Sequence, residues 1–258
     1  MAVFILATLF CINLIFALNV KYAGMDTKAI LTVFGNTLEQ GPDGSFLNPE
    51  MILDHILSAI AIAIFFVSLF LSLFSVSSVY PDMIKQGYVD MLISKPLSRS
   101  SVFFQRFGGA MTGVFINIFY IIIFSWLILS LKFEIWSMSF LASGFVILLF
   151  FYNIFSMMIM ISMFVKNPVV ALLSTYFLVF IISPIIAAVE RFGGSEGSFR
   201  SIISGFLNGV LPKVSDAVIF INAFHTGKDV SANIPIAAFL SGTMFLAVSL
   251  YVFKKTDF

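Results

Sequence analysis

Charged residues, cysteines and histidines are all scarce in this chain. Of 258 residues only 10% are charged, whereas about a quarter is usual in a soluble domain. With 60% apolar residues and a mean hydropathy of +1.07, the chain is expected to lie in a lipid bilayer. A net charge of +1 gives no reason to expect nucleic-acid binding. Because Cys11 is the single cysteine, an intrachain disulfide is excluded.

The sequence also lacks the side chains that metal enzymes and ATPases need. His55 and His225 are the two histidines, no H-E-x-x-H motif is present, and no carboxylate pair lies inside an apolar run. The stretch HTGKD, which starts at His225, lacks the first glycine of a phosphate loop and has Asp229 where Ser or Thr is required. We interpret it as a turn. The chain is therefore expected not to be an enzyme and to bind no metal, cofactor or ATP itself.

Six apolar runs are each long enough to cross a membrane. About 20 helical residues span the ~30 Å hydrocarbon layer, and a helix satisfies its own backbone hydrogen bonds there. The expected fold class is all-α, a polytopic integral membrane protein with six transmembrane helices in a single domain, residues 1–258. The predicted spans are 1–20, 52–76, 108–131, 140–165, 169–189 and 235–253. A signal peptide at 1–20 is the alternative, but that run is long and lacks a basic start.

The segments between the runs set the expected topology. Residues 77–107 form the candidate cytoplasmic loop, and residues 21–51 and 190–234 the external segments. Both sides carry seven basic residues, so their positions decide the orientation. On the cytoplasmic side they are concentrated in one loop and next to the last run: Lys85, Lys95, Arg99, Arg106, Lys254 and Lys255. Six helices then place both termini in the cytoplasm.

Both external segments contain patterns of local structure. The stretch FGNTLEQGPDGSF has turn signals at Gly-Asn and Pro-Asp-Gly and predicts a small hairpin on the membrane surface. Further on, apolar residues recur at helical spacing between Ile202 and Leu211, Pro212 ends that pattern, and VSDAVIFINAF makes a second short piece. Neither piece can span the membrane, so together they predict an external or re-entrant helical hairpin before the sixth helix.

Polar groups are few in the middle of the six runs. Ionisable residues are absent there, which argues against a proton- or ion-coupled transporter. Asn13, Asn117 and Asn153 are expected to form hydrogen bonds between helices, with a role in a substrate pathway as the alternative. Pro184 is expected to kink the fifth helix.

The stretch YPDMIKQGYVDMLISKPLSRSS, from Tyr80 to Ser101, has a compact amphipathic pattern. Pro81 suits a first helical turn, Asp82 favours the positive end of the helix dipole, and apolar residues follow at helical spacing. The pattern predicts a helix of about fourteen residues that Pro96 ends, after which Ser98 can cap the next helix. Two interpretations are open at this point: an interfacial helix that rests on anionic lipid, or a docking helix that a soluble partner grips.

The residues from Gly87 to Arg99 resemble the cytoplasmic loop of ABC-2-type transporter permeases. Members of that family often read G-x-x-(D/E)-x-L-L-S-K-P-(I/L/V)-S-R between the second and third helices, and here Gly87 and Asp90 are followed by LISKPLSR. The tail VFKKTDF is also similar to the family's ending. The opening PDMIKQG looks closest to the branch linked to multicopper-enzyme maturation, such as the permease of nitrous oxide reductase assembly. The motif is short but fairly specific, and the layout of spans extends the resemblance over most of the chain.

The resemblance implies the permease subunit of an exporter, in which the loop between helices 2 and 3 is a coupling helix. In that family the loop sits in a groove of a separate ATPase subunit, and two such ATPases, which bind the ATP and magnesium, drive two permease halves. The implied docking residues are Asp82, Gly87, Tyr88, Asp90, Leu92, Ser94, Lys95, Pro96 and Arg99.

The implied partners are the ABC-type ATPase in two copies, a second permease in a homodimer or heterodimer, and the lipid bilayer of a prokaryotic cytoplasmic (inner) membrane. Family members usually begin with an amphipathic elbow helix, whereas the first apolar run here starts at Met1. A competing hypothesis from another class is a non-transporting membrane scaffold that recruits a soluble protein through its basic loop.

Overall fold

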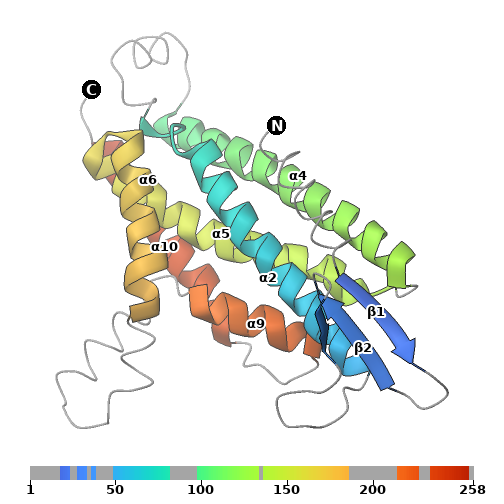
Figure 1. The fold of residues 1–258 in the computed structure, drawn as a ribbon. Coiled ribbons are helices and arrows are strands. Elements are labelled where there is room, and N and C mark those ends of the chain that lie inside the picture. Colours follow the sequence, from blue (N-terminus) through green and yellow to red (C-terminus); the bar gives the residue numbers. More distant parts are fainter. Residues whose placement is uncertain are drawn as a thin grey trace. The chain divides into compact units, whose positions relative to one another are not determined.

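The computed structural model describes residues 18–23, 28–33, 36–38, 49–81, 98–133, 136–185, 214–226 and 233–255. Three short strands come first: β1 (Leu18–Ala23), β2 (Lys28–Val33) and β3 (Asn36–Leu38). The helices are α2 (Pro49–Val76), α4 (Arg99–Phe133), α5 (Met138–Val165), α6 (Pro168–Tyr176), the π-helix η2 (Phe177–Ile182), α9 (Val214–Thr226) and α10 (Asn233–Lys255). Figure 1 shows α2, α4, α5 and α10 as long single helices.

The strands form one antiparallel sheet in the order β1-β2-β3, with Val20 opposite Leu31 and Thr32 opposite Thr37. Of the stretch FGNTLEQGPDGSF, where a small hairpin is predicted, the structure describes only β3, which pairs with β2, and the rest lies outside the described residues. The predicted first span reached too far, since Leu18, Asn19 and Val20 lie in β1. An apolar run of this kind is compatible with a strand as well as a helix, because apolar and polar residues alternate in LNVKY. Residues 1–17 lie outside the described residues.

Five helices among the described residues are long and apolar enough to cross a membrane: Asp54–Val76, Arg99–Leu131, Met138–Val165, Pro168–Ile185 and Asn233–Lys255. They correspond to the second through sixth predicted spans, so a multi-pass helical membrane protein is what the structure supports. From Pro49 onward the described residues contain no strand, as expected for the all-α class. The three-stranded sheet before Pro49 was not predicted and departs from the all-α class.

The third span begins earlier than its apolar run. Residues 99–107 belong to the predicted cytoplasmic segment 77–107 and are helical, as the first part of α4. The cause is the cap: Ser98 Oγ accepts a hydrogen bond from the backbone N–H of Ser101 at 3.2 Å, as expected from its position after Pro96. The helix therefore starts at its cap, while the apolar pattern marks only where the helix meets hydrocarbon.

A two-residue turn joins α5 to α6. Lys166 has a φ of 55°, and its N–H bonds to the Ser162 carbonyl at 2.9 Å, which closes the last turn of α5 in the left-handed conformation that glycine usually adopts. Asn167 then caps α6 by accepting from the N–H groups of Val169 and Val170, and Pro168 occupies the first turn. The turn is therefore specified by capping chemistry.

The fifth span changes from α to π geometry in η2, which ends at Ile182, with Ser183 between it and Pro184. Pro184 has no N–H to donate, and its ring crowds the carbonyl one turn earlier, so the preceding turn widens. The kink expected at Pro184 stays a prediction, and the π-helical turn precedes it. The helix continues through Ser183 to Ile185.

The chain forms two compact units, one of Met1–Ser68, Asn117–Phe145 and Ile219–Val230, the other of Leu69–Ile116, Val146–Val218 and Ser231–Phe258. Helices α2, α4 and α5 contribute residues to both units. A single domain stays a prediction. Of the predicted external helical hairpin, VSDAVIFINAF lies in α9, and the piece from Ile202 to Leu211 lies outside the described residues.

In the second unit, α10 packs closely on α5. The buried face of α10 is mostly small: Ala238, Ser241, Gly242, Phe245, Ser249 and Phe253. At Gly242 the backbones approach so closely that an added Cβ would lie 3.1 Å from the Asn153 Cα. Asn153 itself is buried, and its Oδ1 has no hydrogen-bond partner within the described ranges. The expected bond from Asn153 to a neighbouring helix is therefore missing at this oxygen.

Candidate functional site

Tyr80 lies where the described chain enters the predicted docking loop, and its side chain is completely buried. Its ring centroid is 5.1 Å from that of Phe103 on α4 and 6.4 Å from that of Phe155 on α5. Its hydroxyl donates a hydrogen bond to the Phe103 carbonyl at 3.3 Å, and only 1% of the residue is exposed. Burial raises the pKa of the Tyr80 hydroxyl above its usual range. Tyr80 is therefore a neutral, buried side chain that attaches the start of the loop to α4 and α5.

The Tyr80 contacts continue into a group of aromatic rings in contact, which we call the loop-base cluster: Tyr80, Phe103, Phe107, Phe155 and Phe253. Phe103 lies 5.6 Å from Phe253 near the end of α10, and Phe107 stacks on Phe155 at 5.6 Å. Aromatic pairs at these separations add about 0.5–1.5 kcal/mol beyond the burial of their area. The cluster thus joins α4, α5 and α10 around Tyr80.

Arg99 fixes the other end of the loop. It is the first residue of α4, and its Nη1 donates to the backbone carbonyl of Lys254 in the last turn of α10 at 3.3 Å. The last carbonyls of a helix lack intrahelical donors and carry partial negative charge, which a guanidinium complements. Because Arg99 is exposed, this bond contributes modestly to stability and orients the side chain.

The structure places one of the nine predicted docking residues. Arg99 lies at the loop base as described above. The other eight, Asp82, Gly87, Tyr88, Asp90, Leu92, Ser94, Lys95 and Pro96, lie outside the described residues. The two ends of the segment that holds them, Tyr80 and Arg99, are both attached to the same unit.

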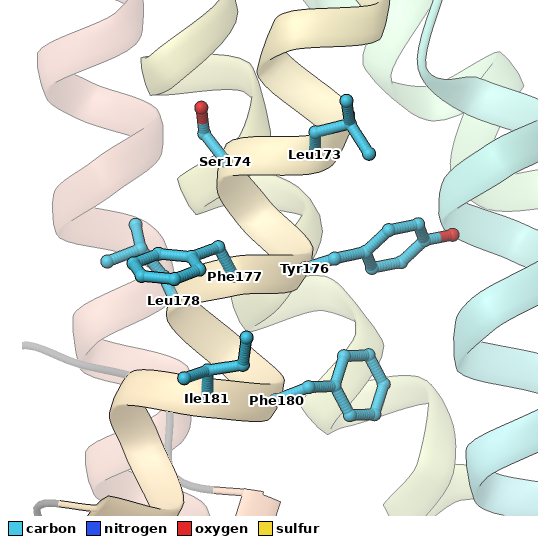
Figure 2. A pocket seen from close by; sticks show the side chains of 7 residues that line it. All are labelled: Leu173, Ser174, Tyr176, Phe177, Leu178, Phe180 and Ile181. Atoms are coloured by element: carbon cyan, nitrogen blue, oxygen red, sulfur yellow. The ribbon is translucent and has the colours of Figure 1, made fainter.

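A shallow hollow of about 750 Å³ lies along α6 and η2 (Figure 2). Leu173, Phe177 and Ile181 line it and are about half exposed, while Tyr176 turns toward α2, stacks on Phe70 at 4.8 Å and donates to the Phe70 carbonyl at 2.6 Å. The lining is apolar apart from Ser174 and Tyr176. Such a surface suits contact with lipid and offers no set of groups for catalysis or metal binding.

A second polar feature joins α2 to α9 in the first unit. Ser58 Oγ donates to Asn222 Oδ1 at 2.9 Å. Asp54 lies one helical turn from Ser58 on α2, and His225 lies one turn from Asn222 on α9. The negative charge of Asp54 raises the pKa of the His225 imidazole. His225 is only 6% exposed, its ring lies 6.0 Å from that of Phe140, and neither ring nitrogen has a hydrogen-bond partner in the part of the chain that the structure describes.

The buried imidazole predicts a pH-dependent stability. Burial lowers the pKa of His225, and Asp54 offsets only part of that shift. Below about pH 6.5 the His225 imidazole binds a proton in the unfolded chain but stays neutral in the folded chain. The contribution of His225 to the free energy of unfolding therefore decreases toward acid and is constant above that pH. We expect the thermal unfolding temperature in detergent to decrease as the pH is lowered from about 7 to about 5.

His225→Gln should remove most of that pH dependence, because glutamine does not titrate. His55→Gln is the matched control: it removes the other histidine, which is exposed, and should leave the dependence in place. If His225→Gln and the unchanged protein lose stability equally toward acid, the assignment to His225 is wrong.

Sequence patterns missed three features of these sites. The sequence predicts Tyr80 only as the start of the loop, and nothing in it shows that Tyr80 meets Phe103 and Phe155. His225 was assigned to a turn, whereas it lies in the last turn of α9. Nothing in the sequence shows that Trp126, inside the predicted span 108–131, meets Trp136, which follows that span, at a ring-centroid distance of 5.1 Å. Comparison of the chain with protein-family models and with curated proteins finds no match.

Proposed function

We propose that this chain is the transmembrane permease subunit of an ABC-2-type exporter, which moves or extracts a substrate across the cytoplasmic membrane with ATP hydrolysed by a separate ATPase subunit. The observation that carries the proposal is the loop-base cluster. A segment that resembles the family's coupling loop begins and ends on residues, Tyr80 and Arg99, that contact three membrane-length helices. A loop that only rested on lipid would need no such attachment.

The proposed mechanism follows from packing. When the ATPase moves the loop, the buried ring of Tyr80 moves with it. Phe103 and Phe155 contact that ring, and protein interiors are packed too densely to absorb the displacement locally. The motion is therefore passed to α4 and α5. Through Phe103 and Phe253, and through the bond from Arg99 to the Lys254 carbonyl, it also reaches α10.

In this proposal the loop residues Asp82, Gly87, Tyr88, Asp90, Leu92, Ser94, Lys95 and Pro96 shape or contact the ATPase surface, and Arg99 serves both the partner and α10. The chain is paired with a second permease, in a homodimer or a heterodimer, and two ATPase subunits bind the ATP and magnesium. The rows of exposed apolar side chains on α4, α6 and α10 fit a protein surrounded by lipid.

Arg99→Glu is the variant that tests the proposal. The purified permease and its candidate ATPase are combined, and ATP hydrolysis is measured in reconstituted vesicles. We expect Arg99→Glu to lower the permease-dependent part of the hydrolysis by tenfold or more, which corresponds to about 1.4 kcal/mol, because it reverses a docking charge. Lys95→Ala and Pro96→Ala together should act in the same direction.

Arg106→Glu is the matched control, since it makes the same charge change on an exposed position of the same helix, beyond the loop base. It should leave hydrolysis nearly unchanged. An ATPase that binds the chain but hydrolyses ATP at one rate, whatever stands at position 99, would favour the scaffold function instead. Purification with no Walker-type ATPase that responds to the permease would overturn the exporter proposal.

A further inference from the structure

The chain has two tryptophans, against 33 phenylalanines, and both lie at the same helix junction. Trp126 belongs to the last turns of α4, and Trp136 precedes Met138, the first residue of α5. Their ring centroids are 5.1 Å apart with an interplanar angle of 72°, an edge-to-face contact. The junction joins two membrane-length helices, Arg99–Leu131 and Met138–Val165.

The polar atoms of this junction are arranged around the indoles. The Trp126 Nε1–H donates to the Ser137 carbonyl at 3.0 Å, and the hydroxyls of Ser137 and Ser139 are 2.7 Å apart. Trp136 is 59% exposed, so its ring is available to whatever surrounds the junction. An apolar ring with one polar N–H is the side chain that suits a boundary between hydrocarbon and water.

The neighbouring side chains indicate where that boundary lies. Leu131 and Met138, which end one span and begin the next, are 73% and 70% exposed. Surfaces this apolar suit lipid chains. Between them along the sequence stand Lys132 and Glu134, whose charges are costly in hydrocarbon. The change from hydrocarbon to headgroups therefore falls within a few residues, at the level of the indoles.

We propose that the Trp126–Trp136 pair is an interfacial anchor, which binds the boundary between headgroups and acyl chains of the bilayer and fixes the depth of the α4–α5 junction. Trp136 contacts the lipid directly, with its N–H toward the ester carbonyl and phosphate oxygens of the headgroup region. Trp126 is a positioning residue, because its bond to Ser137 and its edge-to-face contact hold Trp136 and the turn in place.

The anchor has a consequence for the far end of α4. The span Arg99–Leu131 has 33 residues, which at ~1.5 Å each measure ~50 Å, whereas the hydrocarbon layer is ~30 Å thick. A tilt of ~40°, the upper end of the usual range, still leaves ~38 Å along the membrane normal. With the Leu131 end held at the boundary, the first turn of α4, which holds Arg99, must extend out of the hydrocarbon on the opposite side.

The experiment is tryptophan quenching in vesicles, and it needs no added label because both tryptophans belong to the junction. The full chain is reconstituted into phosphatidylcholine vesicles that carry bromine either near the headgroup end of the acyl chain or near the chain terminus. We expect the shallow bromines to quench at least twice as strongly as the deep ones. Aqueous acrylamide should quench less than it does for free tryptophan.

Single-tryptophan variants separate the two roles. With Trp126→Phe the remaining signal comes from Trp136, which should give the stronger shallow quenching; with Trp136→Phe it comes from the half-buried Trp126, which should be quenched less by every probe. Stronger quenching by the deep bromines would place the junction inside the hydrocarbon and overturn the anchor. Quenching by acrylamide alone would place it in water and overturn it as well. Because these results depend only on depth, they do not depend on the exporter proposal.

Discussion

Tyr80→Ala is expected to be among the most damaging single substitutions in the described part of the chain. It removes a fully buried ring that contacts Phe103 and Phe155 and leaves a cavity beneath the loop. Truncation of a buried aromatic residue to alanine costs about 3–5 kcal/mol when the surroundings cannot collapse. Thermal unfolding in detergent, followed by circular dichroism, should show a clear fall in the midpoint.

Tyr80→Phe is the matched control, because it keeps the ring and removes only the hydroxyl. The lost bond to the Phe103 carbonyl is long, at 3.3 Å, so the cost should be at the low end of about 0.5–1.5 kcal/mol. If the two variants unfold at the same temperature, the ring contacts do not anchor the loop. If the exporter proposal holds, Tyr80→Ala in its folded fraction should also lower permease-dependent ATP hydrolysis, whereas Tyr80→Phe should retain it.

The sequence was sufficient to predict the helices that follow residue 49. Their apolar runs are long, and only a helix satisfies its backbone in lipid, so tertiary contacts had little freedom to change the outcome. The start of α4 was predicted through Ser98, whose hydroxyl can replace a missing backbone partner. Helix α4 is longer than its apolar run, because hydropathy marks the membrane boundary, whereas the cap marks the beginning of the helix.

Other features depend on neighbours that are distant in the sequence. The apolar spacing of α4 shows that Phe103 and Phe107 share a face, but not that Tyr80, Phe155 and Phe253 meet them. Leu18–Val20 is equally compatible with a helix end and with a strand, and its pairing with Leu31–Val33 decided between them. The burial of His225 depends on Phe140, which is far away in the chain and could not be read from the stretch HTGKD.

Gly242 is the position where the smallest change should have a large effect. A Cβ added there would lie 2.6 Å from the Tyr152 Cε1 and 3.1 Å from the Asn153 Cα, so Gly242→Ala requires movement of a ring and of a backbone. Tyr152 cannot easily turn away, because it stacks on Phe239 at 5.6 Å and meets Phe107 at 5.9 Å. Overpacking of this kind costs about 1–3 kcal/mol.

We therefore expect Gly242→Ala to lower the unfolding midpoint, and Gly242→Val to lower it further. Gly109→Ala is the matched control, since a Cβ there meets nothing within 4 Å. It should be neutral or slightly stabilising, because alanine favours a helix over glycine by up to about 1 kcal/mol. Measured against Tyr152→Ala alone, Gly242→Ala should cost less than it does in the unchanged protein, and the cost that remains would measure the contact with the α5 backbone. Equal stability of Gly242→Ala and Gly109→Ala would show that α5 and α10 do not approach as closely as the structure describes.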